Sequence, residues 1–405
     1  MKLKILAYLT IMLSFGILSA HSIFSFYGPA EMNYQRDTYS EGMGGTGLGD
    51  LFRPNVSLLN PALSTTIDKM HFATALSMGY TTYKNSENVS FKDDQIFLPF
   101  FNMIIPFRQH RLGVNFQNIS SGRLSTEQKY RREIDEEEIH LTEIQRVDFT
   151  LFKAGIVYAY QNKYVDWGVG LNYIVGHDVR FFRQDYDSSS LMTSRFETEH
   201  TFNNPSIDIG LAKKLDNVSV GLAYSLPVEL KGDSYFKTNT LNEKVTQAVF
   251  EYPAHAALGI SWKVHELFFV SSDVDIELWG NTKNFENPVN TFRTGFGISW
   301  AGNKDSRRYL ARMPLRSGIS YKNLPFEIND HQISELAYHI GFSLPLKTHD
   351  SYLDVAVKFF QRGDENKHNL SENGFLLTIG TQGFDFLRRP ANRKAPREIP
   401  IPDRR

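Results

Sequence analysis

The sequence predicts an all-β protein, a fourteen-stranded antiparallel transmembrane β-barrel with an N-terminal hatch that plugs the lumen. Two observations support the barrel. From about residue 70 onward, bulky apolar residues alternate with small or polar ones, which indicates strands with two different faces. The connections between these strands also alternate between long polar segments and tight turns, as in outer-membrane barrels.

The first segment, residues 1–22, has the features of a secretory signal peptide. Lys2 and Lys4 precede an apolar run over residues 5–18, and small residues follow at Ala20 and Ser22. We expect cleavage after Ala20 or Ser22. An uncleaved membrane helix is the alternative, but the run is shorter than the roughly 20 residues that a bilayer requires.

The second segment, residues 23–68, shows no strand period and contains a glycine-rich stretch over residues 39–62. Its letters match G-x-G-x-x-G, but no strand–helix–strand unit surrounds them, so nucleotide binding is not expected. The glycines permit tight turns and close packing against a wall. We therefore predict a plug in the lumen, and its candidate gate residues are Gly42, Gly44, Gly45, Gly47, Asn60, Pro61 and Ala62.

The third segment, residues 69–387, carries the fourteen predicted strands. They lie near residues 70–83, 95–107, 110–121, 141–160, 165–182, 195–213, 217–233, 247–263, 266–280, 291–301, 313–323, 334–346, 351–362 and 373–386. A closed barrel pairs every backbone amide within lipid, which explains the even number.

The alternative is a secreted β-sandwich, which also has short alternating strands. Its second face would meet water, which does not favour glycine and alanine so strongly over Lys, Glu and Thr, whereas a crowded lumen does. All four tryptophans fall at predicted strand ends, where an interfacial aromatic girdle is expected. They are Trp167, Trp262, Trp279 and Trp300.

The stretch "GMGGTGLGD", followed by "NPALS" and then fourteen strands, resembles the outer-membrane long-chain fatty-acid transporter family of the FadL/TodX type, which has PorV-like relatives. The resemblance implies a hatch inside the barrel and a hydrophobic ligand that leaves sideways through a break in the wall. It also implies that Asn60, Pro61 and Ala62 oppose an inward kink of the third strand, near residues 112–122. Here "NISSG" supplies residues able to bend.

Several polar residues are predicted to face the lumen. Asp273, Asp275 and Glu277 alternate with apolar neighbours on one strand. Paired carboxylates can perform acid–base chemistry or bind a hard cation, but a ladder of ion pairs with inward bases is the preferred interpretation. The other predicted lumen-facing residues are Arg293, Arg316 and His339.

The composition excludes several functions. The chain has no cysteine and a net charge of −1, so we expect no disulfide, no thiolate site and no nucleic-acid binding. The histidines and serines follow no catalytic or metal-binding motif. We therefore expect no catalytic residue, metal or cofactor, and no enzyme. The acidic run at residues 133–140 is assigned to a solvated outer loop, with binding of Ca²⁺ as the alternative.

The last segment, residues 388–405, is rich in proline and basic. It contains seven basic residues against Glu398 and Asp403, and we expect an extended periplasmic tail, either solvated or anchoring a periplasmic partner. The preceding Phe384 or Phe386 would serve as the terminal aromatic residue of the barrel. The basic residues are Arg388, Arg389, Arg393, Lys394, Arg397, Arg404 and Arg405.

Together these features predict a protein of the outer membrane of a Gram-negative-type bacterium, in contact with outer-membrane lipid. The expected function is passive uptake of a hydrophobic small molecule, long-chain fatty acid-like or a hydrocarbon, with movement of the hatch opening the path. The alternative is a non-transporting, PorV-like barrel that serves protein secretion or surface attachment.

Overall fold

The structure is a computed structural model, and it describes residues 22–383 except 27, 30–31, 34–36, 88, 135–136, 188–190, 286, 304 and 347–350. The predicted signal peptide apart from Ser22, the aromatic residues Phe384 and Phe386, and the basic tail lie outside the described residues.

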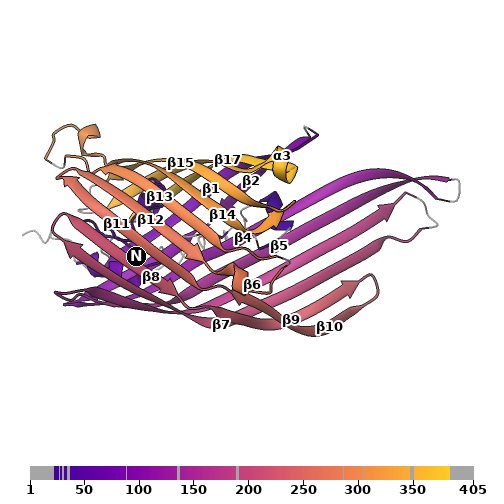
Figure 1. Ribbon diagram of the computed structural model, residues 1–405, viewed down its shortest axis with the longest axis horizontal. Coiled ribbons are helices and arrows are strands. Elements are labelled where there is room, and N and C mark those ends of the chain that lie inside the picture. Colours follow the sequence, from indigo (N-terminus) through magenta and orange to yellow (C-terminus); the bar gives the residue numbers. More distant parts are fainter. Residues whose placement is uncertain are drawn as a thin grey trace, which may run out of the picture.

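Seventeen strands form one antiparallel sheet that closes where β1 pairs with β17 (Figure 1). The strands are β1 (His71–Asn85), β2 (Ser90–Phe97), β3 (Phe100–Phe107), β4 (His110–Ile134), β5 (Glu137–Tyr160), β6 (Asp166–Tyr186), β7 (Ser194–Leu215), β8 (Val218–Ser225), β9 (Val228–Thr238), β10 (Asn242–Tyr252), β11 (His255–His265), β12 (Phe268–Glu277), β13 (Thr291–Trp300), β14 (Leu315–Ile328), β15 (His331–Pro345), β16 (Tyr352–Asp364) and β17 (Leu370–Gln382).

Three prolines explain why seventeen strands make a fourteen-stranded barrel. Pro99, Pro227 and Pro253 lie between β2 and β3, β8 and β9, and β10 and β11. Both members of a pair face the same neighbour: β1 pairs with β2 and β3, and β7 with β8 and β9. Proline has no N–H to donate to a ladder, so each one interrupts a barrel strand without ending it. The prediction of a closed fourteen-stranded barrel is confirmed.

Exposed and buried side chains alternate along the wall, as the period of two predicted. On β11, Leu258, Ile260 and Trp262 point outward and are 45% to 50% exposed, whereas Ala257 and Ser261, at alternating positions, are buried. Outward-facing apolar residues recur on the neighbouring strands. A lipid bilayer is the medium that accepts such a belt, while the small inward residues leave room in the lumen.

The polar connections at one end are shorter than predicted because the strands continue into them. β4 reaches Ile134 and β5 begins at Glu137, so most of the acidic run at residues 133–140 belongs to a hairpin and not to a loop. Ladder pairing satisfies backbone amides that would otherwise need water. β4 to β7, β9 and β10 consequently project beyond the rest of the barrel (Figure 1).

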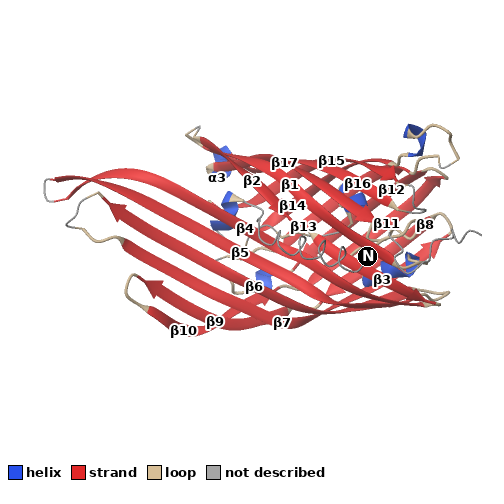
Figure 2. Ribbon diagram, turned by 180° about the vertical axis from the view of Figure 1, so that it is seen from behind, coloured by secondary structure: helices blue, strands red, loops and turns tan. Residues whose placement is uncertain are grey.

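The described helices are short and lie outside the barrel strands. They are η1 (Ile23–Phe26), α2 (Thr38–Glu41), η2 (Pro61–Thr66), η3 (Trp279–Asn281), η4 (Leu310–Arg312) and α3 (Glu365–His368) (Figure 2). Within the described part of the chain, no helix is long and apolar enough to cross a membrane.

Trp279 corrects one prediction. Trp167 and Trp262 are exposed at strand ends, but Trp279 is fully buried in η3 and belongs to no aromatic girdle. Its indole Nε1 donates to Glu277 Oε2 at 2.7 Å. The connection between β12 and β13 therefore turns this ring toward buried residues, and the chain's periodicity carries no signal for such a loop.

Candidate functional site

The described residues between 22 and 70, here called the N-terminal segment, meet the barrel wall through glycines. Gly44 has φ of +73°, and a Cβ placed there would lie 2.7 Å from the Ile319 carbonyl oxygen. The wall is equally intolerant: a Cβ on Gly295 would lie 2.6 Å from the Gly44 oxygen, and one on Gly318 would lie 2.4 Å from the Gly44 nitrogen. Backbone therefore packs directly on backbone, which only glycine permits.

The other predicted glycines share this stretch. Gly42 packs against Gly341 of β15, where a Cβ on Gly42 would lie 2.9 Å from the Gly341 Cα. Gly45 and Gly47 have φ of +64° and +116°, which disfavours residues with side chains. Farther along, the carbonyl of Leu48 would lie 2.1 Å from a Cβ on a wall glycine of β8. The contacts thus continue around the wall.

Asn60, Pro61 and Ala62 form the start of η2. The Asn60 side chain accepts a hydrogen bond from the Ala62 N–H at 3.1 Å, and its Nδ2 donates to the Leu211 carbonyl oxygen of β7 at 3.2 Å. On β6, a Cβ at Gly168 would lie 2.6 Å from the Pro61 carbonyl carbon. The asparagine therefore caps the turn and ties it to the wall.

This position corrects the expectation that the Asn-Pro-Ala element opposes residues 112–122. The element lies against β6 and β7 instead. A different piece of the N-terminal segment meets the third barrel strand: the Asn33 N–H donates to the Ile119 carbonyl oxygen at 2.6 Å, and Met32 forms a bridge with Ser120. The register of β4 shifts between Asn118 and Ser120 at this same point.

The wall has a seam beside that shift. β4 pairs with β3 as far as Gln117, and the Asn118 N–H then donates to the Pro99 carbonyl oxygen at 3.0 Å. Beyond this point the described residues form no ladder between β4 and β2, because β2 pairs with β1 alone. We call the boundary between β2 and the part of β4 after Gln117 the seam, and the proline explains why pairing stops there.

The three predicted carboxylates of β12 are buried, and they bind different groups. Asp273 accepts from the Leu48 N–H at 2.9 Å, Asp275 pairs with Arg293 at 2.7 Å, and Glu277 holds the buried tryptophan. Arg293 also donates to the Gly44 and Gly45 carbonyl oxygens. Among the described residues, no group of three His, Cys, Asp or Glu could hold a metal ion. Asp273 directly, and Asp275 through Arg293, thus anchor the N-terminal segment to the wall, whereas Glu277 holds the connection after β12.

Arg316 and His339 lie on β14 and β15. The Arg316 guanidinium stacks on the Tyr39 ring at 4.0 Å and lies 3.5 Å from Asp354, so its acidic partner is not on β12. His339 Nε2 lies 2.9 Å from Ser320 Oγ, and its Nδ1 lies 3.6 Å from Glu41.

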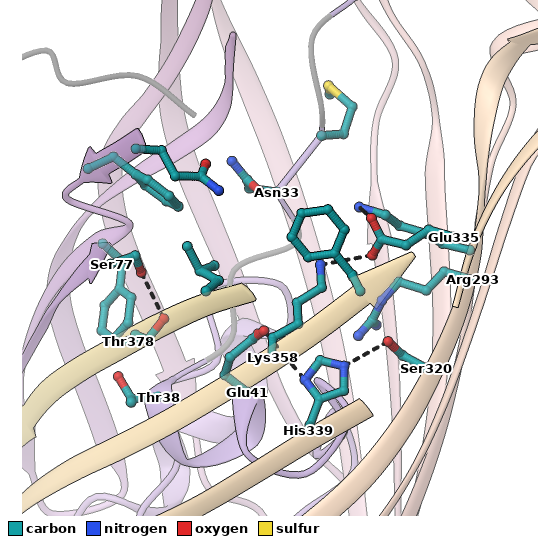
Figure 3. Close-up of a pocket in the computed structure, with 17 residues that line it drawn as sticks. Asn33, Thr38, Glu41, Ser77, Arg293, Ser320, Glu335, His339, Lys358 and Thr378 are labelled. Carbon is teal, nitrogen blue, oxygen red and sulfur yellow. Dashed lines mark hydrogen bonds and ion pairs between the residues drawn. The ribbon is translucent and has the colours of Figure 1, made fainter. Parts of the chain in front are cut away.

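His339, Ser320 and Glu41 line a charged cavity of about 70 Å³, whereas Arg316 lies outside it (Figure 3). Lys322, Lys358, Glu335 and Arg293 contribute to its wall, and Lys358 pairs with Glu335 at 2.8 Å. Its volume exceeds that of a few water molecules only slightly. Apolar residues form part of its lining, but the charged side chains do not suit a hydrocarbon. The apolar lining residues are Met32, Phe97, Phe100, Phe360 and Leu376.

A buried ion network inside the N-terminal segment had no sequence signal. Arg53 pairs with Asp37 at 2.5 Å and with Asp50 at 2.9 Å. Burial alone would raise the pKa of Asp37, but the charge and hydrogen bonds of Arg53 hold this pKa below its usual range. At Asp50 the effect of burial is larger than that of the Arg53 charge, so the pKa of this carboxyl is raised. Residues 16 positions apart reveal such a network only once the segment is folded.

An apolar cluster fills another part of the interior. Phe149, Phe202, Phe250 and Trp279 are each at most 6% exposed and contact one another edge to face or at a tilt. The full cluster contains Met32, Ile119, Phe149, Leu151, Ile174, Phe202, Leu230, Ala248, Phe250, Tyr252 and Trp279. Because Met32 and Ile119 lie beside the seam, the cluster reaches from the lumen to the gap in strand pairing.

Solved structures share this fold. The Pseudomonas putida toluene transporter TodX matches with a TM-score of 0.62 and 16% identity, covering 88% of this chain and 99% of that chain. A Pseudomonas aeruginosa FadL homologue matches with a TM-score of 0.60 and 13% identity, covering 89% and 100%. The Ralstonia pickettii toluene transporter TbuX gives 0.58 and 12%, covering 85% and 97%. The barrel is thus of the FadL type, and the protein belongs in the outer membrane.

A search of curated proteins finds no match. One family model does match, over residues 1–382, and it is described as BamG. This match covers nearly the whole chain, including the N-terminal segment and all fourteen barrel strands. The chain therefore belongs to the BamG family.

Proposed function

We propose that this protein carries hydrophobic small molecules passively across the outer membrane and releases them sideways through the seam. One observation carries the proposal: the apolar lumen cluster runs without interruption to Met32 and Ile119, where β2 and β4 are unpaired. An apolar solute would exchange packing partners along this route, which meets a buried carboxylate at the Trp279 end, where the indole donates to Glu277. The similarity to toluene transporters supports the same class of ligand.

The contacts favour a fixed hatch. Between Thr38 and Ala62 the N-terminal segment packs on wall glycines by backbone contact, so any shift would break many close contacts together. Met32 and Asn33 are attached differently: a bridge, a backbone hydrogen bond and a hydrogen bond from the Gln117 side chain join them to β4, and Met32 packs in the apolar cluster. In our proposal the glycines and the Asn-Pro-Ala element hold the plug in place, and the path opens at Met32 and Asn33.

Disulfide trapping tests this proposal, because the chain has no cysteine. The pair Met32→Cys/Ser120→Cys would lock the seam. The matched pair Thr65→Cys/Asp166→Cys would tie η2 to β6, where the native side chains are 3.0 Å apart. We expect oxidation of the first pair to stop uptake of radiolabelled fatty acid or toluene into proteoliposomes, with recovery on reduction. Oxidation of the second pair should leave uptake unchanged.

Equal uptake by proteoliposomes and protein-free liposomes, for both solutes, would overturn the proposal. If oxidation of the second pair stopped uptake and oxidation of the first did not, the protein would still be a transporter. Its gate would then lie at η2 and not at Met32 and Asn33. Oxidation is confirmed in each sample by a gel shift that reductant reverses.

A non-transporting barrel for protein secretion or surface attachment is the second candidate. The fixed N-terminal segment and the small charged cavity favour it, and the projecting ribbon of β4 to β7, β9 and β10 offers a surface to another protein. Under this hypothesis, the protein extracted in mild detergent carries a stoichiometric protein partner and no small molecule. Native mass spectrometry with lipid extraction separates the two candidates.

A further inference from the structure

One connection at the periplasmic end of the barrel does not follow the pattern of tight turns. Residues 301–314 join β13 to β14, whereas β3 and β4, or β7 and β8, are joined at the same end by residues 108–109 and 216–217 alone. The short turns of an outer-membrane barrel face the periplasm, so this connection lies at the periplasmic side of the membrane. With its helix η4 it rises above the outline of the wall and not along the barrel axis (Figure 1 and Figure 2). We call residues 301–314 the basic connection.

The basic connection has a defined backbone. The Asn303 N–H donates to the Ala311 carbonyl oxygen at 2.7 Å, and the Arg312 N–H donates to the Tyr309 carbonyl oxygen at 3.0 Å. The Tyr309 hydroxyl donates to the Pro345 carbonyl oxygen, at the end of β15, at 3.4 Å. These bonds close the loop on itself and tie it to the wall, so its side chains project from defined positions.

Two neighbouring side chains of the basic connection expose apolar surface. Leu310 is 75% exposed and Tyr309 is 44% exposed. A single exposed leucine is ordinary on a protein surface, but this pair is continuous with the lipid-facing belt. Trp300, the last residue of β13, pairs across the sheet with Leu315, the first residue of β14, and Leu315 is 48% exposed. An aromatic ring and a leucine at this level are typical of the boundary between lipid and water.

Positive charge accompanies these apolar side chains. The sequence of the connection contains Lys304, Arg307, Arg308 and Arg312 against a single acid, Asp305. Arg307 and Arg308 are exposed, and the Arg312 guanidinium lies 5.4 Å from the centre of the Tyr309 ring. In the part of the chain that the structure describes, no acidic residue forms an ion pair with these three arginines. Their guanidinium groups are therefore available to an incoming anion, and phosphate matches the guanidinium geometry.

We propose that the basic connection binds anionic phospholipids of the periplasmic leaflet. Lipid phosphates lie on Arg307 and Arg308, while Tyr309 and Leu310 lie among the headgroups and the upper acyl chains. Three features together favour lipid over a soluble protein: the sideways direction of the connection, its continuity with the lipid-facing belt, and its excess of basic residues. The inference does not depend on transport through the seam.

The first test measures where the connection lies, and the absence of cysteine allows a label at one chosen position. An environment-sensitive fluorophore is attached to Leu310→Cys or, as the matched control, to Asn217→Cys in the exposed turn between β7 and β8. Both proteins are placed in nanodiscs of phosphatidylcholine and phosphatidylglycerol. We expect doxyl-labelled lipid to quench the label at residue 310 and iodide in water to quench the label at residue 217. Equal access of iodide to both labels would overturn the proposal.

The second test measures lipid binding by native mass spectrometry of the full chain in mild detergent with added phosphatidylglycerol. We expect Arg307→Ser/Arg308→Ser to retain this lipid roughly tenfold more weakly than wild type. The control Lys163→Ser/Lys214→Ser removes the same charge from the mouth of the barrel and should retain the lipid like wild type. Equal loss in both variants would contradict the proposal, because it indicates a general effect of net charge.

A different result would assign the connection to a protein partner. In that case the label at residue 310 is open to iodide in nanodiscs but protected in protein that is extracted from its own membrane together with another polypeptide. The connection would then be a protein-docking surface, and the lipid proposal would fail.

Discussion

The two flanks of the barrel wall hold the N-terminal segment in opposite ways. On β6 to β8, β11 and β13 to β15, wall glycines admit its backbone to direct contact, and buried charges reinforce the fit. Between β2 and the part of β4 after Gln117 the described residues form no ladder. Met32 and Asn33 meet β4 there through a bridge and hydrogen bonds, and Met32 packs in the apolar cluster. The contrast separates attachment by backbone packing from attachment by side-chain packing and a few hydrogen bonds, and in our proposal the second region is the one that opens.

The largest expected effect comes from breaking the buried network of the rigid side. Arg53→Met leaves Asp37 and Asp50 buried without their cation, which should cost about 3–5 kcal/mol of unfolding free energy. Urea unfolding in lipid vesicles measures it. The control is Lys84→Met, which breaks the partly exposed pair of Lys84 with Glu365 and should cost less than about 1 kcal/mol. If both variants lost the same unfolding free energy, the buried Arg53 network would not be what makes this side of the wall rigid.

Adding one methyl group to the wall should have the next largest effect. Gly168→Ala places a Cβ against the Pro61 backbone, which cannot move aside like a flexible side chain, so we expect a loss of about 1–3 kcal/mol. Gly170→Ala is the control on the same strand and face, since its nearest contact is the Asn172 side chain at 3.3 Å. Heat-modifiable gel mobility and urea midpoints compare them. If both variants unfold at the wild-type midpoint, the backbone contact at Gly168 carries no weight.

Acid should loosen the same side. The pKa of Asp37 is lowered in the folded state, so its contribution to stability is present above the ordinary aspartate pKa of about 3.9 and is lost as the pH falls through the folded value. Asp50 acts in the opposite direction because its pKa is raised. We therefore expect Asp50→Asn to make the fall in stability on acidification steeper than in wild type. A shallower fall would contradict these signs.

The smallest expected effect concerns the seam and is measured on the wild-type protein. Backbone amides of β4 between Ser121 and Glu127 that face the seam should exchange hydrogen faster than amides of β13 and β14, which are paired on both sides. Hydrogen exchange of the folded protein in micelles measures the difference. Uniform protection around the whole barrel would show that the seam is closed in solution.

Much of the wall was predictable because its signal is local. The alternation in "LGISW" at residues 258–262 already separates lipid-facing from lumen-facing positions, and the structure places Leu258 and Ile260 outward as expected. The turn glycines were also visible in the chain, because their conformation depends on neighbours only a few residues away. The role of Asn60 as the cap of η2 was not predicted. The predicted long loops failed where hairpin pairing continued through polar residues such as Glu138.

The sequence by itself determined the class of protein: an all-β barrel with an apolar exterior, a small-residue interior and a glycine-rich N-terminal segment. Only the tertiary structure decided which distant segments are in contact. Asn60 lies on β6 and β7 and not on the third strand, Trp279 is buried, and Arg53 joins two aspartates. The physical reason is that periodicity reports the environment of one strand at a time. The seating of a plug depends on contacts between segments hundreds of residues apart, which no local pattern encodes.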